Sequence, residues 1–390
     1  MIAAAHQIAS RSEPQAGHEI LRAVEELHDL IDGHGEENDR EGQLAGPVIE
    51  ALHTAGVIGI LSPRELGGAE LSPRQAMDVV RTLSYADPAT GWVAFALAFA
   101  TGLAGAFLSR ATAEELFADP RMGVAGQGTR PGTASTVDGG YLISGDWSFG
   151  SGIKHATHVL APAVDTASGQ PICAFLPRDQ AELVDHWDVL GLRGTGSIDY
   201  RLRNVFVPAS HTFSMVGMEP GLITGGTLYR IGLGDFASIN HGAWALGTSR
   251  RLLDELAAAV RGKGGHAAGD AFTEDFAEAE TKLRSAKAFL YEVWEEIEQE
   301  IAGGDRPTVR QATLNRMALN NATWRARDIA AFVYASSGTA ALRNGTIQRL
   351  VRDVHGGTQH ISSSRLILQS AGRELTGLAE GQHWVHHILK

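Results

Sequence analysis

Residues 140–158, GYLISGDWSFGSGIKHATH, form the stretch around which the rest of the chain is organised. Their pattern predicts a strand, a tight turn at Ser144-Gly145, and a second strand carrying Trp147, Phe149 and Ser151. Alternate side chains of a strand project to one face, so two aromatic rings and a hydroxyl would share that face. The glycines that follow would let a flat molecule approach the backbone closely. The stretch predicts either a wall for a planar ring system or a plain hairpin packed into a core.

The sequence on either side of this stretch is helical. Up to Met122 apolar residues recur at helical spacing, and long helical patterns return from about Asp235. Between them lie short β-rich runs punctuated by glycine and proline. We expect an α+β protein with an N-terminal α-helical domain at 1–122, a middle β domain at 123–225 and a C-terminal helical bundle at 226–390.

Composition and net charge limit the kinds of molecule that the protein is expected to bind. The 390 residues are 44% hydrophobic and 20% charged, which is ordinary for a soluble protein with a large core. The formal charge of -12 argues against a nucleic-acid backbone or an acidic membrane as partner. Cys173 is the single cysteine, so neither an internal disulfide nor a cysteine-rich metal site is expected. The first residues lack the pattern of a secretory signal, and we expect a cytoplasmic protein.

Three further patterns in the sequence bear on possible sites. Gly232–Ala237 matches a dinucleotide pattern weakly, but helix rather than a strand-helix-strand unit surrounds it. His383, His386 and His387 near the C-terminus lack a carboxylate at ligand spacing, so no metal site is expected. His355 and His360 flank a Gly-Gly-Thr loop, where a histidine could face either a cleft or the solvent.

Five segments together resemble the acyl-CoA dehydrogenase superfamily, and the resemblance extends from about residue 35 to 375. It implies an N-terminal helical domain, a middle β-barrel and a C-terminal four-helix bundle. The segments are VIEALHTAGVIGILSPRELGGAELS (48–72), GQGTRPGTAS (126–135), GDWSFGSG (145–152), LGLRGTGSIDYRLRNVFVP (190–208) and VRDVHGGTQHISSS (351–364).

Two departures from the family pattern select a branch. Gly356 stands where many dehydrogenases carry their glutamate base, so proton abstraction has no agent there. Residues 261–275 lack the family segment that grips the adenine half of FAD. The chain therefore resembles the class D flavin-dependent monooxygenases, the oxygenase components of two-component systems. An acyl-CoA dehydrogenase-like FAD flavoprotein is the alternative enzyme, and a scaffold that has lost its flavin is the non-enzymatic one.

The resemblance implies an activity and partners. The protein would take reduced FMN, or FAD, from a separate NAD(P)H:flavin reductase and react it with O2. A C4a-hydroperoxyflavin would then hydroxylate a small organic substrate, aromatic or polycyclic, in a homotetramer. The helix at 91–102 carries no histidine for a phenol, and Phe95 and Phe99 on it would either line a bulky apolar substrate or simply belong to the core.

The resemblance also implies roles for single residues. His360 would orient or protonate the distal oxygen, and Ser151 would hydrogen bond near flavin N5. The cofactor-binding residues would be Gln127 and Thr129 at the pyrimidine edge, Trp147 and Phe149 beside the ring, Ser135 at the phosphate, and Thr358.

Overall fold

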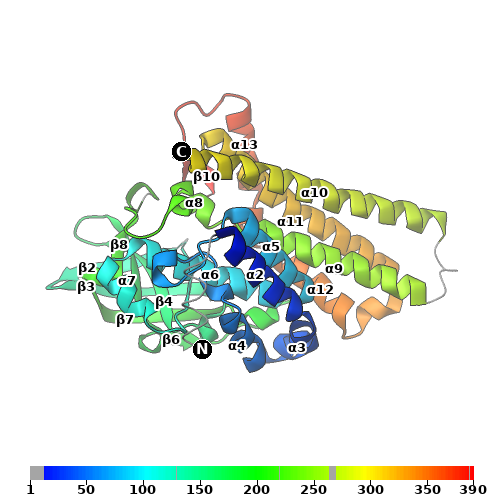
Figure 1. The fold of residues 1–390 in the computed structure, drawn as a ribbon, viewed down its shortest axis with the longest axis horizontal. Helices are drawn as coiled ribbons and strands as arrows, with labels where there is room; N and C mark the ends of the chain where they lie inside the picture. Colours follow the sequence, from blue (N-terminus) through cyan, green and yellow to red (C-terminus); the bar gives the residue numbers. More distant parts are fainter. Residues whose placement is uncertain (1–12, 129, 219, 263–268, 386) are drawn as a thin grey trace.

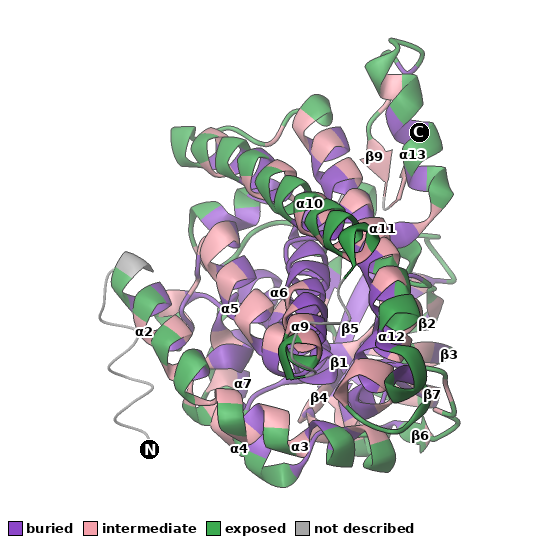
Figure 2. Ribbon diagram, turned by 90° about the vertical axis from the view of Figure 1, so that its right-hand side faces the viewer, coloured by how far each residue is buried: buried purple, intermediate pink, exposed green. Residues whose placement is uncertain are grey.

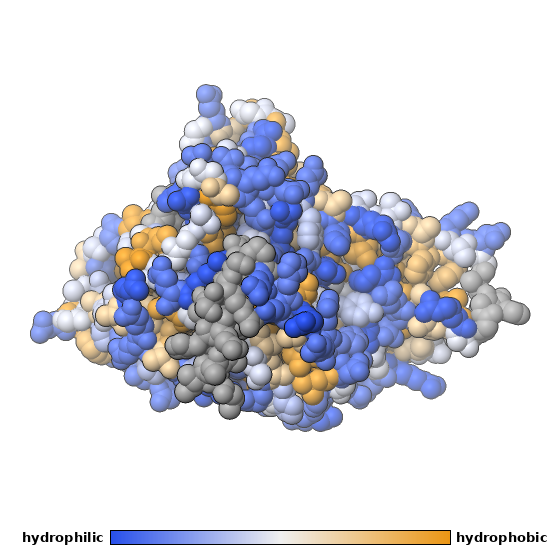
Figure 3. Space-filling view, in the orientation of Figure 1, coloured by the Kyte–Doolittle hydropathy of each residue, from blue (hydrophilic) through white to orange (hydrophobic). Residues whose placement is uncertain are grey.

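The computed structural model describes residues 13–128, 130–218, 220–262, 269–385 and 387–390. In Figure 1 the sheet lies at one end of the molecule and the long helices α9 to α12 extend to the other, with the N-terminal helices across the middle. This order of helices, sheet and helices agrees with the sequence prediction. On the face shown in Figure 3 hydrophilic residues predominate, with hydrophobic ones in scattered patches.

The N-terminal helices pack around one buried helix. They are α2 (Glu13–Glu26), α3 (His28–Glu41), α4 (Gly46–Thr54), α5 (Pro73–Ala86), α6 (Pro88–Phe107) and α7 (Arg110–Phe117). Helix α6 begins after Asp87, which caps it by accepting a hydrogen bond from the Thr90 backbone N–H at 3.0 Å. Among the described residues α6 is the one helix long and apolar enough to cross a membrane, but it lies inside the protein (Figure 2).

The β domain is one sheet of eight strands with the order β6-β7-β3-β2-β4-β5-β8, and β1 pairs with β4. The pairings in this order run from β6 to β8 and do not close into a ring, so closure of a barrel stays a prediction. The strands are β1 (Val124–Gly126), β2 (Gly132–Val137), β3 (Gly140–Gly150), β4 (His158–Asp165), β5 (Pro171–Pro177), β6 (Glu182–Val184), β7 (Ile198–Pro208) and β8 (Thr212–Ser214).

The predicted turn at Ser144-Gly145 is wrong, because β3 is a single strand through that point. The hairpin turn lies earlier, at Gly139, whose φ of 76° suits glycine. Gly145 serves packing instead: a Cβ there would lie 2.6 Å from the Trp147 ring. The register of β3 against β7 shifts between Ile143 and Gly145, and again between Trp147 and Gly150. The second shift decides which side chains of β3 can reach a ligand.

The C-terminal part is a bundle of long helices. Its elements are α8 (Leu233–Phe236), α9 (His241–Gly262), α10 (Asp270–Gly303), α11 (Val309–Ser337), α12 (Thr346–Gly357) and α13 (Arg365–Leu375), followed by the short strands β9 (Trp384–Val385) and β10 (Ile388–Leu389). These long helices agree with the helical patterns expected from about Asp235 onward. The predicted domain boundaries at 122 and 225 remain predictions.

A cluster of buried charges joins the three parts of the chain. Asp353 of α12 accepts a hydrogen bond from the Leu192 backbone N–H, before β7. Arg349, one turn earlier, lies 3.8 Å from Asp87 at the start of α6, and Asn38 of α3 donates to the same carboxylate at 3.2 Å. All of these side chains are buried. The cluster therefore holds α12 against the N-terminal helices α3 and α6 and against the segment that precedes β7.

Candidate functional site

Helix α6 offers one aromatic face that is less buried than the rest of the helix. All of its residues are buried except Phe95, Ala96 and Phe99, which lie about one turn apart on one side. Trp92 precedes them on the same face, with its ring centroid 5.0 Å from that of Phe95. A helix so deeply buried exposes an aromatic face only where something else can lie against it.

A chain of hydroxyl groups connects this face to the sheet. The Trp92 indole N–H donates to the Ser151 hydroxyl at 3.2 Å, and that hydroxyl lies 2.7 Å from the hydroxyl of Ser197. Ser197 is in turn 2.7 Å from Thr195, which donates to the Leu192 carbonyl. The predicted site residue Ser151 is therefore held between the β domain and α6. Sequence reasoning missed Trp92, because nothing local marks it as the partner of a serine 59 residues away.

His360, predicted as the catalytic histidine, reaches the same place from the C-terminal part. Its ring lies 5.6 Å from the Trp92 ring, at a near-perpendicular angle. The Ser362 backbone N–H donates to its Nδ1 at 3.3 Å, which places the proton of the neutral ring on Nε2. Desolvation by the surrounding protein lowers the pKa of His360 to about 4, although the residue remains exposed to solvent. Thus His360 offers a neutral N–H donor at an accessible position.

His241, the first residue of α9, completes the cluster and was not predicted. Its ring stacks on that of His360 with centroids 4.6 Å apart, and it also packs against Trp92 and Phe95. The side chain is 2% exposed, and within the described residues neither ring nitrogen has a hydrogen-bond partner. Burial, followed by the nearby His360, lowers its pKa well below the usual value. The available signal was a histidine three residues before Trp244, whose ring also borders Trp92.

The structure corrects the prediction that Trp147 lies beside a flavin. The indole is 1% exposed and stacks on Tyr200 inside the β domain, with ring centroids 5.4 Å apart. Its N–H donates to the Pro162 carbonyl at 3.2 Å. The register shift between Trp147 and Gly150 breaks the strict alternation, so Trp147 and Phe149 do not share a face. Trp147 is a core residue in this structure.

Phe149 remains available for a planar ligand. It is 66% exposed at the end of β3 and meets the edge of Trp187 at 6.1 Å. Its φ of 65° lies in the left-handed region, which is unusual for a residue with a Cβ. Backbone strain of this kind gathers at functional sites, and an exposed aromatic ring favours a flat partner.

The other predicted cofactor residues in the described part of the chain either make hydrogen bonds within the protein or lie exposed on its surface. The Gln127 backbone N–H donates to the Tyr200 hydroxyl at 3.3 Å, and its side-chain amide donates to the Arg130 carbonyl at 3.2 Å. Ser135 is exposed on β2. The Thr358 hydroxyl donates to the His355 carbonyl at 2.7 Å and accepts from the Gln359 side-chain amide at 3.2 Å. Thr129 lies outside the described residues, as do residues 263–268 of the segment compared with the adenine-binding pattern.

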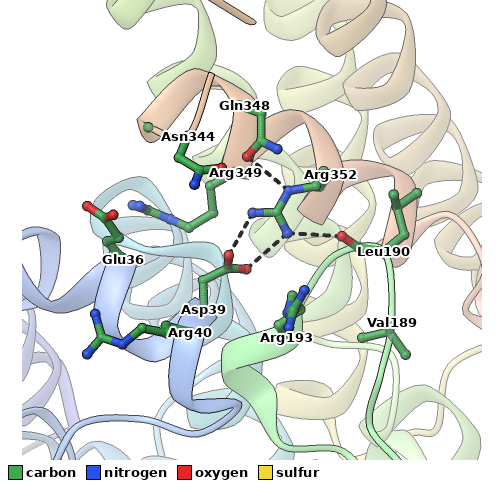
Figure 4. A pocket seen from close by; sticks show the side chains of 11 residues that line it. Glu36, Asp39, Arg40, Val189, Leu190, Arg193, Asn344, Gln348, Arg349 and Arg352 are labelled. Atoms are coloured by element: carbon green, nitrogen blue, oxygen red, sulfur yellow. Dashed lines mark hydrogen bonds and ion pairs between the residues drawn. The ribbon is translucent and has the colours of Figure 1, made fainter. Parts of the chain in front are cut away.

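One cavity, of about 500 Å³, lies away from this cluster. It opens between α3, the loop at 189–193 and the start of α12 (Figure 4). His360 follows the other end of α12, about 18 Å further along for a twelve-residue helix. Inside the cavity Arg352 donates to both carboxylate oxygens of Asp39, at 2.7 and 3.1 Å. These paired charges serve to hold α12 on α3, and we assign no reaction to this cavity.

Comparisons with known proteins identify the acyl-CoA dehydrogenase fold. Two family models match: "Acyl-CoA dehydrogenase, N-terminal domain" over residues 18–116 and "Acyl-CoA dehydrogenase, C-terminal domain" over residues 239–365. Indole-3-acetate monooxygenase of Pseudomonas putida is 32% identical over 355 residues, 87% of this chain and 89% of the relative. The flavin-dependent monooxygenase oxygenase subunit HsaA of Mycobacterium tuberculosis is 28% identical over 88% of this chain and 91% of its own.

Two solved structures superpose closely. The crystal structure of HsaA from M. tuberculosis has a TM-score of 0.85 at 26% identity, covering 93% of this chain and 97% of that one. XiaF from Streptomyces sp., in complex with FADH2 and glycerol, has a TM-score of 0.85 at 20% identity, covering 94% and 96% of the two chains. The second likeness shows the fold alone.

Proposed function

Since the chain belongs to the flavin-dependent monooxygenases of acyl-CoA dehydrogenase fold, we propose that the cluster of Ser151, Trp92, His360 and His241 is its oxygenation site. The protein is the oxygenase component of a two-component system, which receives reduced flavin from a separate reductase and uses O2. We propose an aromatic substrate, in line with relatives named for indole-3-acetate and resorcinol. The observation that carries the proposal is the contact of one indole, Trp92, with groups from all three parts of the chain.

The residues present fit a flavin. Phe149 and Trp187 expose flat apolar surface at the end of β3, and the Gln127 amide lies on the loop that precedes β2. We propose that these residues hold the ring, with Ser151 at its edge, and that Ser135 and Thr358 bind farther along the flavin chain. A bound reduced flavin, FMNH2 or FADH2, supplies the electrons that activate O2. The protein contributes position, a proton donor and the exclusion of water.

Two groups in the cluster can act on the reacting oxygen and the substrate. His360 presents its Nε2–H as a neutral donor, and it can hold or give a proton at that atom. Phe95 and Phe99 supply an apolar surface for an aromatic ring. The rings of Trp92 and Trp244 meet edge to face 5.0 Å apart and cover the buried His241 imidazole, while His360 stays open to solvent.

The dehydrogenase alternative is disfavoured by the space around Gly356. A Cβ at this position would lie 3.2 Å from the Gly191 carbonyl oxygen, with the rest of that residue's backbone close behind. A side chain at this position would need the Gly191 backbone to give way by a few tenths of an ångström. We also propose the homotetramer expected above, supported by apolar side chains left exposed on and after α13, among them Leu366, Leu368 and Leu378.

An isotope experiment tests the proposed function. The protein is mixed with FMN, NADH, a flavin reductase and indole-3-acetate under ¹⁸O2, and the products are examined by mass spectrometry. We expect one ¹⁸O atom in an aromatic product that forms only when all components are present. Full flavin turnover with no labelled product from indole-3-acetate, resorcinol or dibenzothiophene would refute an aromatic monooxygenase. Reduction of bound FAD by an acyl-CoA thioester would favour the dehydrogenase instead.

A further inference from the structure

We propose that His241 accepts a hydrogen bond from an N–H or O–H group on the ring of an aromatic substrate, and thereby selects the substrates that the site takes. This inference rests on the proposed function, because it names the group that recognises the substrate within the same cluster. It goes beyond that function by assigning the recognition to α9, whose first residue no sequence pattern singled out.

The first observation is that His241 is buried without a partner. Its side chain is 2% exposed, and both ring nitrogens lack a hydrogen bond within the described residues. A buried polar group without a hydrogen bond opposes folding, so such groups are rare unless a ligand or a function supplies the partner. Because burial lowers its pKa, the ring is neutral near pH 7 and keeps a lone pair on one nitrogen.

The second observation is that the other polar atoms of the cluster already have defined roles. The Trp92 N–H donates to Ser151, and the Trp244 N–H donates to the Pro88 carbonyl at 3.0 Å. His360 accepts at Nδ1 from Ser362, so its remaining ring atom, Nε2, is a donor. Among the rings of this cluster His241 is thus the one that brings an available acceptor. The ligand group that complements an acceptor is an N–H or an O–H.

The third observation concerns charge. The rings packed against His241 are those of Trp92, Phe95, Trp244 and His360, the imidazole of His387 is the other charge that acts on it, and no lysine or arginine is among these groups. An anion brought against these rings would lose its hydration without gaining an ionic partner. The group that meets His241 is therefore neutral, and any carboxylate of the substrate lies elsewhere. A hydrogen bond from a ring N–H or O–H also makes the aromatic ring richer in electrons, which suits attack by an electrophilic oxygen.

His360 controls access to His241. It is exposed, and it lies over the His241 ring at 4.6 Å, held by one backbone hydrogen bond of 3.3 Å. A ligand reaches the buried imidazole once the His360 ring turns aside. This movement would bring the His360 donor to the edge of the ligand while His241 gains its missing partner.

A matched pair of ligands tests the proposal on the intact flavin-loaded protein. Indole and indene have nearly the same shape, but indene lacks the N–H. By equilibrium dialysis we expect the wild-type protein to bind indole about tenfold more tightly, the ratio that one ordinary net hydrogen bond gives. His241→Phe should bring the indole-to-indene ratio close to one, and His241→Gln, which restores an acceptor, should recover part of it.

His355→Phe is the matched control, because His355 is a half-buried histidine whose Nδ1 contacts the Val351 carbonyl instead of this cluster. Its ratio should equal that of the wild type. A wild-type ratio near one, or a His241→Phe protein that still prefers indole tenfold, would overturn the proposal. Labelled product in the ¹⁸O2 experiment together with either result would show that only the role of His241 has failed, because that experiment uses the wild-type protein alone.

Discussion

At the scale of single residues, the site depends on which groups carry a proton. His360 has its tautomer set by one backbone N–H, and desolvation lowers its pKa to about 4. It is therefore a neutral donor over the whole range in which most enzymes work. An ordinary histidine would change its charge near pH 6.5.

This difference gives a prediction for pH dependence. A base with a lowered pKa stays neutral until the pH approaches that pKa from above. The fraction of oxidised flavin that yields product should therefore be constant from about pH 6 to pH 9 and should decline only toward pH 4. Measuring product and hydrogen peroxide across this pH range gives that fraction and tests the prediction. An inflection near pH 6.5 would show that His360 titrates normally.

Removal of the imidazole should uncouple the reaction. In His360→Ala flavin oxidation should continue while product falls and peroxide rises, with product formation slowed about 10²–10⁴-fold if His360 acts as a general acid. His355→Ala, five residues earlier, serves as the control. Unchanged coupling in His360→Ala would remove His360 from the mechanism.

Ser151 should matter for stability as well as for the flavin. Replacing it by alanine leaves the Trp92 indole N–H buried without its acceptor, which should destabilise the protein by about 1–3 kcal/mol. Urea unfolding measures this loss. Ser148→Ala, on a half-buried neighbour in β3, should change the free energy of unfolding by much less. Equal losses in the two variants would contradict the hydrogen bond.

The sequence indicated part of this site and not the rest, for a physical reason. His360 and Ser151 lie in segments whose local pattern resembles a known family, and the structure brings them to the same indole. Trp92 and His241 look like ordinary helix residues in the sequence, because only long-range packing brings them together. The roles assigned to Gln127, Ser135 and Thr358 remain predictions.

At the scale of elements, β3 shows where pattern reasoning fails. Strict alternation would place Trp147, Phe149 and Ser151 on one face, but the register shift before Gly150 separates the first two. Such an irregularity depends on the pairing with β7, which the sequence of β3 alone does not reveal. The helices were easier to predict, because apolar spacing and caps such as Asp87 are local signals.

The strained backbone of Phe149 predicts an unusual order of stability for two variants at this position. Glycine accepts a φ of 65° readily, whereas alanine keeps the Cβ that opposes it. Phe149→Gly should therefore be more stable than Phe149→Ala by about 1 kcal/mol, the reverse of the usual order in strands. Chemical unfolding compares the two variants. Both should bind flavin more weakly than the wild type, and normal flavin affinity would remove Phe149 from the ring site.

At the scale of the whole molecule, three segments far apart in the chain meet at buried charges. Burial, as the main cause, raises the pKa of Asp353 to about 7, while the hydrogen bond from Leu192 and the nearby Arg349 oppose the shift. Burial likewise raises the pKa of Asp87 despite Arg349 beside it. Both carboxyls therefore ionise less readily than an exposed aspartate while they hold the N-terminal helices, the sheet and the bundle together.

The raised pKa of Asp353 implies a pH-dependent stability. The stabilisation from this group is fully present below its unfolded pKa of about 4 and is lost as pH rises through about 7. Asp353→Asn keeps an oxygen for the Leu192 N–H but cannot ionise. Relative to the wild type, the variant should therefore gain roughly 1–4 kcal/mol in free energy of unfolding between pH 4 and pH 8. Unfolding curves at several pH values measure this difference, and parallel pH profiles would contradict it.

The overall order of helices, sheet and helices was predictable, because periodicity changes at 123 and again near 235. Closure of the sheet into a barrel and assembly into a tetramer, which the resemblance implies, stay predictions because both depend on surfaces that meet only after folding. The resemblance identified the class of reaction where spacing alone left two interpretations open.

The position of Trp92 has an optical consequence. Trp92 and Trp244 meet at right angles 5.0 Å apart, and both border the paired imidazoles. Oxidised flavin absorbs at the wavelengths where indoles emit, so a ring settling against this cluster would dim the protein's own ultraviolet fluorescence. The chain therefore contains a built-in reporter of occupancy, which can follow flavin arrival and departure without any attached dye.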